Sequence, residues 1–211
     1  MLKQITLKPT HPLYYRIEEC VGVEGLTVDF DRGVNVLCGA NGSGKSTLFN
    51  ALKSFLLEGG SQECFEYKIF KPASPEHQYV YFLDMRTLTA KEMLKDAERN
   101  PNPNPSLDMG SEILRMWKSN GEQMHKIVDD IAELGKGARL IFLDEPELSL
   151  DFEAMNKLVS TLNEIANNGC TVVAISHHPL LVLNKTFNVV GLDGTNDYAL
   201  GMKDAILNVI Q

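Results

Sequence analysis

The sequence predicts an α/β fold in which helices flank a mainly parallel central sheet. Short apolar runs with the length of buried strands alternate with longer segments of helical periodicity. A glycine-rich stretch joins the apolar run 34–38 to the helix that follows it. Polar residues come directly after the later runs 79–83, 139–143 and 171–175. An open α/β sheet binds ligands at the carboxyl ends of its strands, so these polar residues are the first site candidates.

Length and composition indicate one globular domain. The chain has 211 residues, of which 44% are hydrophobic and 23% charged, values typical of a domain that buries a core. Its first residues lack the apolar run of a secretory signal, and no stretch approaches the roughly eighteen apolar residues of a membrane span. We therefore expect a cytoplasmic protein that does not insert into a membrane.

The net charge of −8 is unevenly distributed along the chain. Residues 1–105 carry 12 basic and 13 acidic side chains, whereas residues 106–211 carry 8 basic and 15 acidic ones. Any nucleic-acid contact is therefore expected in the first half, because surplus carboxylates repel phosphates. The four cysteines are Cys20, Cys38, Cys64 and Cys170, and they lack the spacing of a zinc site or a disulfide framework. We therefore expect them to be reduced thiols, most of them in the core.

The glycine-rich stretch fits the phosphate-binding pattern G-x-x-x-x-G-K-[ST] from Gly39 to Ser46. Its glycines let consecutive N–H groups turn inward around a polyphosphate at the start of a helix. Lys45 would reach the β- and γ-phosphates, and the Ser46 hydroxyl would bind Mg²⁺. The flanking strand and a helix expected from Ser46 to Leu57 supply the required context. The predicted nucleotide-binding residues of this loop are Asn41, Gly42, Ser43, Gly44, Lys45, Ser46 and Thr47.

A pair of carboxylates ends the predicted strand 139–143. Asp144 would hold Mg²⁺ there through a water molecule, and Glu145 would act as general base toward the attacking water. An acidic pair is unlikely to end a buried strand by chance in a chain that also carries a lysine-containing phosphate loop upstream. Asp144 and Ser46 are therefore the predicted metal ligands.

A histidine occupies the corresponding position after the predicted strand 171–175. His177 is predicted to sense the γ-phosphate, and His178 is the less favoured candidate for that role. A lone histidine is most often a structural residue, but this one follows the carboxyl end of a strand. The predicted catalytic residues are Glu145, Lys45 and His177.

The N-terminal region predicts a small antiparallel sheet beside the main one. Its short β-rich segments are Ile5–Leu7, Tyr14–Glu18 and Leu26–Phe30. In the second segment, Tyr14, Tyr15 or Arg16 could stack on an adenine. The preferred interpretation is an ordinary strand in which the two tyrosines alternate between its faces.

Residues after the phosphate loop predict a strand over Tyr79–Leu83 and a helix over Thr89–Arg99. Asp84 and Arg86 follow the strand, where they would face the ligand. One face of the helix is basic and carries Lys91, Lys95 and Arg99. We interpret this face as a solvated surface rather than as a nucleic-acid contact. The proline-rich segment 100–105 predicts an exposed loop.

Together these motifs resemble the heads of ABC-type ATPases, in particular the branch of RecF-like, structural-maintenance-of-chromosomes-like and OLD-like ATPases. Gly39–Thr47 resembles the Walker A motif of this family, and Leu140–Glu145 resembles Walker B with its catalytic glutamate. Glu147–Asp151 is similar to the D-loop, and Ser176-His177 to the switch histidine. The resemblance implies a P-loop NTPase fold that takes ATP and Mg²⁺ as cofactors and hydrolyses ATP.

The family also has a signature motif that opens a helix ahead of Walker B, and Ser119–Gln123 fits it. By the resemblance, Ser119, Gly121 and Glu122 would bind the γ-phosphate of a nucleotide held by a second subunit. A helix N-terminus suits an anion because its N–H groups are unpaired and its dipole end is positive. The same residues can cap the helix expected over 121–134. Their position relative to Walker B favours the binding interpretation.

The chain departs from the family pattern at the Q-loop, where a glutamine that contacts Mg²⁺ would follow the strand 79–83. Asp84, Arg86 or Gln78 would take that place. The segment before the signature is too short for a long coiled coil and has no cysteine pair for a zinc hook. Nothing after His178 resembles a nuclease domain, which implies a stand-alone head.

The resemblance divides the single domain 1–211 into a nucleotide-binding core, 1–60 and 136–211, and a helical signature subdomain, about 86–135. Further elements are expected within it: a helix over 152–167, and short strands and a terminal helix over 188–210. Two copies would close head to tail around two Mg·ATP. The dimer would drive a separate effector protein, such as a nuclease, in DNA repair or genome defence. DNA is a candidate ligand. Two alternatives stay open. They are the nucleotide-binding subunit of a membrane ABC transporter and a non-hydrolysing, ATP-gated binding module.

Overall fold

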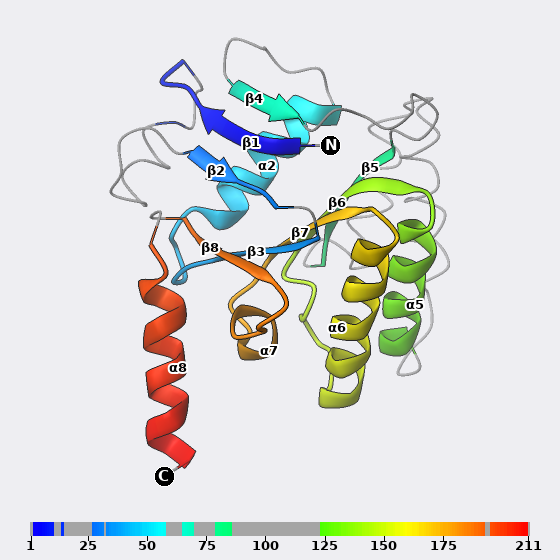
Figure 1. Cartoon of the computed structure of the whole chain (residues 1–211), viewed down its shortest axis with the longest axis vertical. Helices are drawn as coiled ribbons and strands as arrows, with labels where there is room; N and C mark the ends of the chain where they lie inside the picture. The colour runs from blue at the N-terminus through cyan, green and yellow to red at the C-terminus, as the bar shows by residue number, and fades with distance from the viewer. Residues whose placement is uncertain are drawn as a thin grey trace.

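Figure 1 shows the computed structural model of the chain, in which residues 2–10, 14, 27–31, 33–57, 65–69, 79–85, 123–192 and 195–210 are described. Within these residues the backbone forms a five-stranded sheet, a three-stranded sheet and the helices that pack on them. The five-stranded sheet lies at the centre of the molecule (Figure 1).

The central sheet consists of parallel strands in the order β5-β6-β7-β3-β8. Every residue of β3 and β7 is buried, which explains their nearly unbroken apolar sequences. Because the strands are parallel, their carboxyl ends meet at one edge, and the predicted mainly parallel α/β sheet is confirmed. The strands are β3 (Val34–Cys38), β5 (Tyr79–Asp84), β6 (Ala138–Asp144), β7 (Thr171–Ile175) and β8 (Asn188–Gly191).

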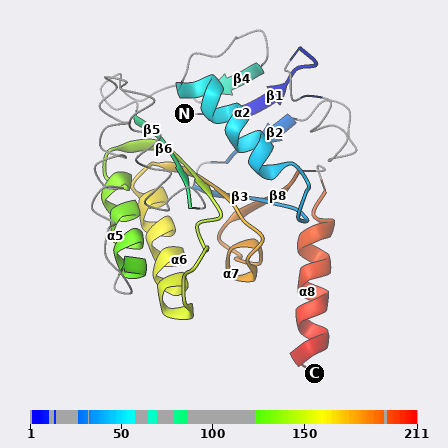
Figure 2. The same cartoon turned by 180° about the vertical axis from the view of Figure 1, so that it is seen from behind.

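Helices cover both faces of this sheet. On one face, α2 (Lys45–Leu57) lies between the two sheets (Figure 1, Figure 2). On the other face lie α5 (Gln123–Gly135), α6 (Phe152–Asn167) and the short α7 (Pro179–Val182). The C-terminal α8 (Asp197–Ile210) extends away from the body of the molecule (Figure 1).

The longer helices begin close to where the sequence predicts them. Asp151 caps α6, because its Oδ1 accepts a hydrogen bond from the backbone N–H of Ala154 at 2.8 Å. Helix α6 has the predicted bounds, α2 begins one residue before the predicted Ser46, and the terminal helix of the tail is confirmed as α8. Helix α7 was not predicted.

The predicted N-terminal antiparallel sheet is confirmed, but its composition differs. Strand β1 (Leu2–Leu7) is central and pairs with β2 (Thr27–Asp29) and with β4 (Phe65–Ile69). The sequence around β4 has little periodicity, so this strand was missed. The predicted strand Tyr14–Glu18 is wrong at the one residue of it that is described: Tyr14 is helical and 4% exposed. Burial of its ring decides its conformation there, rather than the β propensity of tyrosine.

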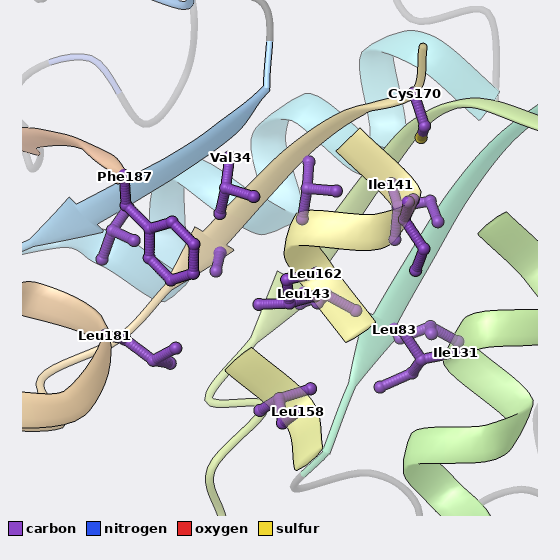
Figure 3. Packing of buried hydrophobic residues seen from close by; sticks show 14 of the residues in the cluster. Val34, Leu83, Ile131, Ile141, Leu143, Leu158, Leu162, Cys170, Leu181 and Phe187 are labelled. Atoms are coloured by element: carbon purple, nitrogen blue, oxygen red, sulfur yellow. The ribbon is translucent and has the colours of Figure 1, made fainter. Parts of the chain in front are cut away.

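Two hydrophobic clusters separate the layers. The first lies between the central sheet on one side and α2 and β1 on the other. In it, the rings of Phe82 and Phe142 stack with their centroids 4.4 Å apart. The second packs the opposite face of the sheet against α5, α6 and α7, and Figure 3 shows Leu143 of β6 beside Leu162 of α6 within it. Each fully buried leucine contributes about 1.5–3 kcal/mol, so these two layers hold the strand ends in fixed positions.

Several predictions concern residues outside the described ranges. These are Tyr15 and Arg16, the helix 89–99 with its basic face, the proline-rich segment 100–105, the signature residues 119–122, and the Q-loop candidates Gln78 and Arg86. The same holds for Cys20 and Cys64, whereas Cys38 and Cys170 are buried as expected. None of the described helices is long and apolar enough to cross a membrane.

Candidate functional site

The glycine-rich loop leaves the carboxyl end of β3 and turns directly into α2. Gly42 and Gly44 have φ of 83° and 88°, a left-handed backbone that favours glycine. Ser43 N donates to Ala40 O at 3.2 Å, and the first helical bond runs from Leu48 N to Gly44 O at 2.9 Å. The N–H groups of the first turn of α2, from residue 45 on, therefore point toward the loop without helical partners.

Lys45 is buried at the base of this loop, with 7% of its surface exposed. Its Nζ donates to Gly39 O at 2.7 Å and to Ala40 O at 2.8 Å. Burial lowers the pKa of Lys45, and the carboxylates of Glu145 and Asp144 oppose that shift. The ammonium group is thus held inside the loop and faces the acidic end of β6.

Asp144 and Glu145 leave the carboxyl end of β6. Asp144 is fully buried and pairs in register with Asp84 of β5 on one side and Ile175 of β7 on the other. Glu145 has φ of 51°, a left-handed conformation that costs energy for a residue with a Cβ, and its N–H donates to Ile175 O at 2.9 Å. This bend turns the chain away from the sheet immediately after the acidic pair.

The end of β7 carries the predicted histidine. Ser176 is fully buried, and its N–H donates to Leu37 O at 3.1 Å, which ties the end of β7 to the end of β3. The His177 side chain is 44% exposed, whereas the Nδ1 atom of His178 accepts a hydrogen bond from Leu180 N at 3.2 Å and caps α7. The structure thus gives His178 a local partner and leaves the imidazole of His177 facing outward.

Glu147 joins two of these strand ends, and no role beyond its place in the D-loop was predicted for it. Its Oε1 accepts hydrogen bonds from Ser176 Oγ at 2.6 Å and from His177 N at 3.2 Å. The signal in the sequence was a third carboxylate two residues after Glu145, in a loop that would otherwise expose it. Its contact with Ser176 depends on the neighbouring strands β6 and β7, which a linear pattern does not reveal.

The donor set at this edge fits a magnesium ion shared with a substrate phosphate. Mg²⁺ is usually bound by one or two carboxylates together with water and phosphate oxygens rather than by an all-protein cage. Asp144 supplies a buried carboxylate, and Ser46 supplies a half-buried hydroxyl in the first turn of α2. In the part of the chain that the structure describes, no group of three or more His, Cys, Asp and Glu side chains could hold a metal alone.

The parallel sheet therefore brings together residues that are far apart in the sequence: the phosphate loop after β3, the acidic pair after β6 and the histidine after β7. Such a loop between a buried strand and a helix, with its lysine and the carboxylates of a second strand at the same edge of one parallel sheet, defines the class of P-loop nucleoside triphosphatases. The fold is that of a P-loop NTPase.

Comparisons with known proteins identify the family. A model described as an AAA domain matches residues 16–71, and one described as "AAA domain, putative AbiEii toxin, Type IV TA system" matches residues 126–184. The hemin import ATP-binding protein HmuV of Agrobacterium fabrum is 30% identical over 187 residues, which cover 74% of this chain and 70% of that protein. The chain belongs to the family of ABC-type ATP-binding proteins and is an ABC-type ATPase head.

Other similar proteins differ in how much of their length the chain spans. It is 24% identical over 203 residues to the probable branched-chain amino acid transport ATP-binding protein LivG of Methanocaldococcus jannaschii, covering 79% of this chain and 78% of that protein. It is 28% identical over 181 residues to ABC transporter CDR4 of Candida albicans, covering 74% of this chain and 12% of that protein. A solved nucleotide-free ATP-binding cassette from an ABC transporter aligns with a TM-score of 0.49 at 18% identity, over 92% of this chain and 89% of that chain.

Proposed function

We propose that the chain binds Mg·ATP at the carboxyl edge of its central sheet and hydrolyses it. The observation that carries this proposal is the placement of Lys45, after β3, and of the acidic pair Asp144 and Glu145, at the end of β6, on the same carboxyl edge of one parallel sheet. Phosphoryl transfer to water requires a cation that binds the phosphates. It also requires carboxylates, one to hold the metal and one to activate the water.

The phosphate loop and the first turn of α2 would hold the nucleotide. N–H groups from Asn41 to Thr47 would surround the phosphates, and Lys45 would exchange its bonds to loop carbonyls for bonds to β- and γ-phosphate oxygens. The Ser46 hydroxyl and the Asp144 carboxylate would hold Mg²⁺, which neutralises phosphate charge when bound.

Glu145 and His177 would act on the γ-phosphate side. Glu145 is half-buried and stands one residue beyond the proposed metal ligand, where its carboxylate would accept a proton from the attacking water. The exposed imidazole of His177 would donate to the γ-phosphate and report its presence. Asp84, which pairs in register with Asp144 at the end of β5, would take the place of the Q-loop glutamine.

We infer that the site is completed by a second copy of the chain, which would bring Ser119, Gly121 and Glu122 to the γ-phosphate. The single domain 1–211 would then contribute its core to one nucleotide and its signature subdomain, about 86–135, to the other. Two large apolar side chains near the acidic pair support a partner at this surface: Leu148 is 40% exposed and Phe152 is 74% exposed.

The partner that uses this ATPase is proposed from the comparisons. Two relatives that align with most of this chain are named as a hemin import ATP-binding protein and a probable branched-chain amino acid transport ATP-binding protein. They favour a role as the nucleotide-binding subunit of a membrane ABC transporter. Affinity purification of the tagged chain from membranes should then recover a permease with several membrane spans, and recovery of a soluble partner alone would contradict this role.

A second candidate is an ATPase of the RecF-like, structural-maintenance-of-chromosomes-like and OLD-like branch that drives a soluble effector. The match of residues 126–184 to a model described with a toxin of a type IV system favours it, as does the absence of glutamine directly after β5. DNA repair has no such support from the comparisons. Stimulation of ATP turnover by DNA, with no permease bound, would favour this candidate over the transporter.

Hydrolysis itself is tested by Glu145→Gln, which keeps the shape of the side chain and removes its ability to take a proton. We expect phosphate release to fall at least about a hundredfold while ATP binding is retained. Glu153→Gln, at an exposed position of α6, is the matched control and should behave as the wild type. Equal turnover by the Glu145→Gln variant and the wild type would contradict the assignment, and ATP binding without any phosphate release by the wild type would indicate a non-hydrolysing module.

A further inference from the structure

Glu147 connects the loop after β6 to the loop after β7 through a short, buried link. Ser176 Oγ donates to Glu147 Oε1 at 2.6 Å, and the backbone N–H of His177 donates to the same oxygen at 3.2 Å. Glu147 is 9% exposed and Ser176 is fully buried, so water competes little with these bonds. The link therefore holds the two loops together more firmly than a surface contact would.

The network continues beyond Ser176 and fixes the backbone on both sides of His177. Ser176 Oγ also accepts a hydrogen bond from His178 N at 2.9 Å, and His178 in turn caps α7. The His177 ring lies beside this network, with its Nδ1 atom 3.9 Å from Glu147 Oε1. The Nδ1 edge of the ring therefore lies on the side of Glu147, which leaves the Nε2 edge to meet a ligand.

On its other side, Glu147 is tied to Glu145. The turn between them is closed by a bond from Leu148 N to Glu145 O at 3.0 Å, and Glu145 N is bonded to Ile175 O at 2.9 Å. Glu145 keeps its left-handed φ of 51° inside this turn. A shift of the Glu147 side chain would therefore move a strained turn that carries the proposed general base.

The side chain of Glu147 is only partly satisfied by its hydrogen bonds to Ser176 and His177. Its second carboxylate oxygen, Oε2, is buried with no hydrogen-bond partner among the described residues. A glutamine could accept the same bonds from Ser176 and His177 through one oxygen.

We propose that Glu147 is a positioning residue that couples Glu145 to His177, so that the general base and the γ-phosphate sensor are set together. This inference rests on the proposed ATP hydrolysis. Glu147 would not contact the nucleotide itself. Its effect on turnover would pass through the orientation of the His177 ring and the turn that carries Glu145.

A double-mutant cycle tests this coupling with purified full-length protein and Mg·ATP. We expect Glu147→Ala to lower kcat at least about tenfold while KM for ATP changes less than about threefold, because the residue acts after binding. Added to His177→Ala, it should lower kcat by clearly less than it does alone, since part of its effect passes through His177. Glu164→Ala, at an exposed position of α6, is the matched control and should leave kcat unchanged.

Two further variants keep the test decisive. Glu147→Gln retains one acceptor oxygen, so it should recover part of the kcat that Glu147→Ala loses. Ser176→Ala removes only the 2.6 Å bond to Glu147 and the bond from His178, and it replaces Glu147→Ala in the cycle if that variant does not fold. Full additivity with His177→Ala, or an unchanged kcat in Glu147→Ala, would overturn the coupling. A wild type that hydrolyses ATP normally distinguishes that failure from a failure of the proposed function.

Discussion

Lys45 Nζ donates a 2.7 Å hydrogen bond to the carbonyl oxygen of Gly39, so the ammonium group closes the glycine-rich loop upon itself. A second bond to Ala40 O at 2.8 Å completes this arrangement. The loop is therefore preshaped by the same side chain that is proposed to bind phosphate. A phosphate group would replace neutral carbonyl acceptors with charged ones, which form stronger hydrogen bonds with an ammonium group.

Replacing Lys45 with alanine should weaken ATP binding at least about tenfold, because the loop loses both its internal bonds and its phosphate-binding charge. Titration with a fluorescent ATP analogue measures this change. Lys203→Ala, at an exposed position of α8, is the control and should bind as the wild type does. Unchanged affinity in Lys45→Ala would exclude this lysine as a nucleotide ligand.

Asp144→Asn should raise the Mg²⁺ concentration needed for half-maximal ATP turnover at least about tenfold, because an amide oxygen binds the ion far more weakly than a carboxylate. The substitution keeps the size of the buried side chain, so the fold should persist. Turnover measured against Mg²⁺ concentration gives the shift, with Asp204→Asn on the exposed surface of α8 as the control. An unshifted Mg²⁺ curve would remove Asp144 from the metal site.

Gly135→Ala should destabilise the fold by about 1–3 kcal/mol, because α5 and α6 are closely packed at this position. A Cβ atom at Gly135 would overlap Cγ1 of Ile165 and stand 2.7 Å from its Cδ1, whereas one at Gly137 would meet nothing within 4 Å. Urea unfolding compares the two variants, and Gly137→Ala should cost little. Shortening Ile165 to alanine should make the added cost of Gly135→Ala much smaller, and simple additivity of the two changes would contradict the packing explanation.

Asn35→Leu should lower the free energy of unfolding by about 2–4 kcal/mol, because it leaves several buried polar groups unpaired. Asn35 is fully buried, accepts from Asp31 N at 2.8 Å and Asn188 Nδ2 at 2.9 Å, and donates to Val172 O at 3.2 Å. Asn156→Leu on the exposed face of α6 is the control, with an expected change within about 0.5 kcal/mol. Equal unfolding midpoints for these two variants would show that the network around Asn35 contributes no stability.

The sequence predicted the parts of the fold that are locally encoded. Strands β3 and β7 and helix α6 have clear apolar patterns and clear ends, so their bounds were predicted correctly, whereas β6 extends one residue further at each end than the predicted 139–143. Strand β4 has no such pattern and exists because β1 offers it an antiparallel partner. The order of the strands, with β3 between β7 and β8, depends on packing over long sequence distances and was not predicted.

The candidate site shows the same division. Lys45, Asp144 and His177 were predicted because each belongs to a motif at the end of a strand, and the parallel sheet brings those ends together. Glu147 was given no chemical role, since its bond to Ser176 joins residues of different strands. The left-handed φ of Glu145 was likewise not predicted, because nothing in the residue type favours it.

The central claim is that each ATP site is shared between two copies of the chain, and mixing two inactive variants tests it most directly. Lys45→Ala removes the phosphate loop of one copy, and Ser119→Ala removes its signature. Each variant alone should be nearly inactive. In a mixed dimer one site is intact, because it combines the phosphate loop of the Ser119→Ala copy with the signature of the Lys45→Ala copy.

Phosphate release by an equal mixture is the measurement. Half of the dimers would be mixed and each would hold one working site, so the account predicts recovery of about a quarter of the wild-type rate. Recovery should depend on protein concentration, as dimer formation does. A mixture no more active than the separate variants, with both variants folded and the wild type active, would contradict a shared site.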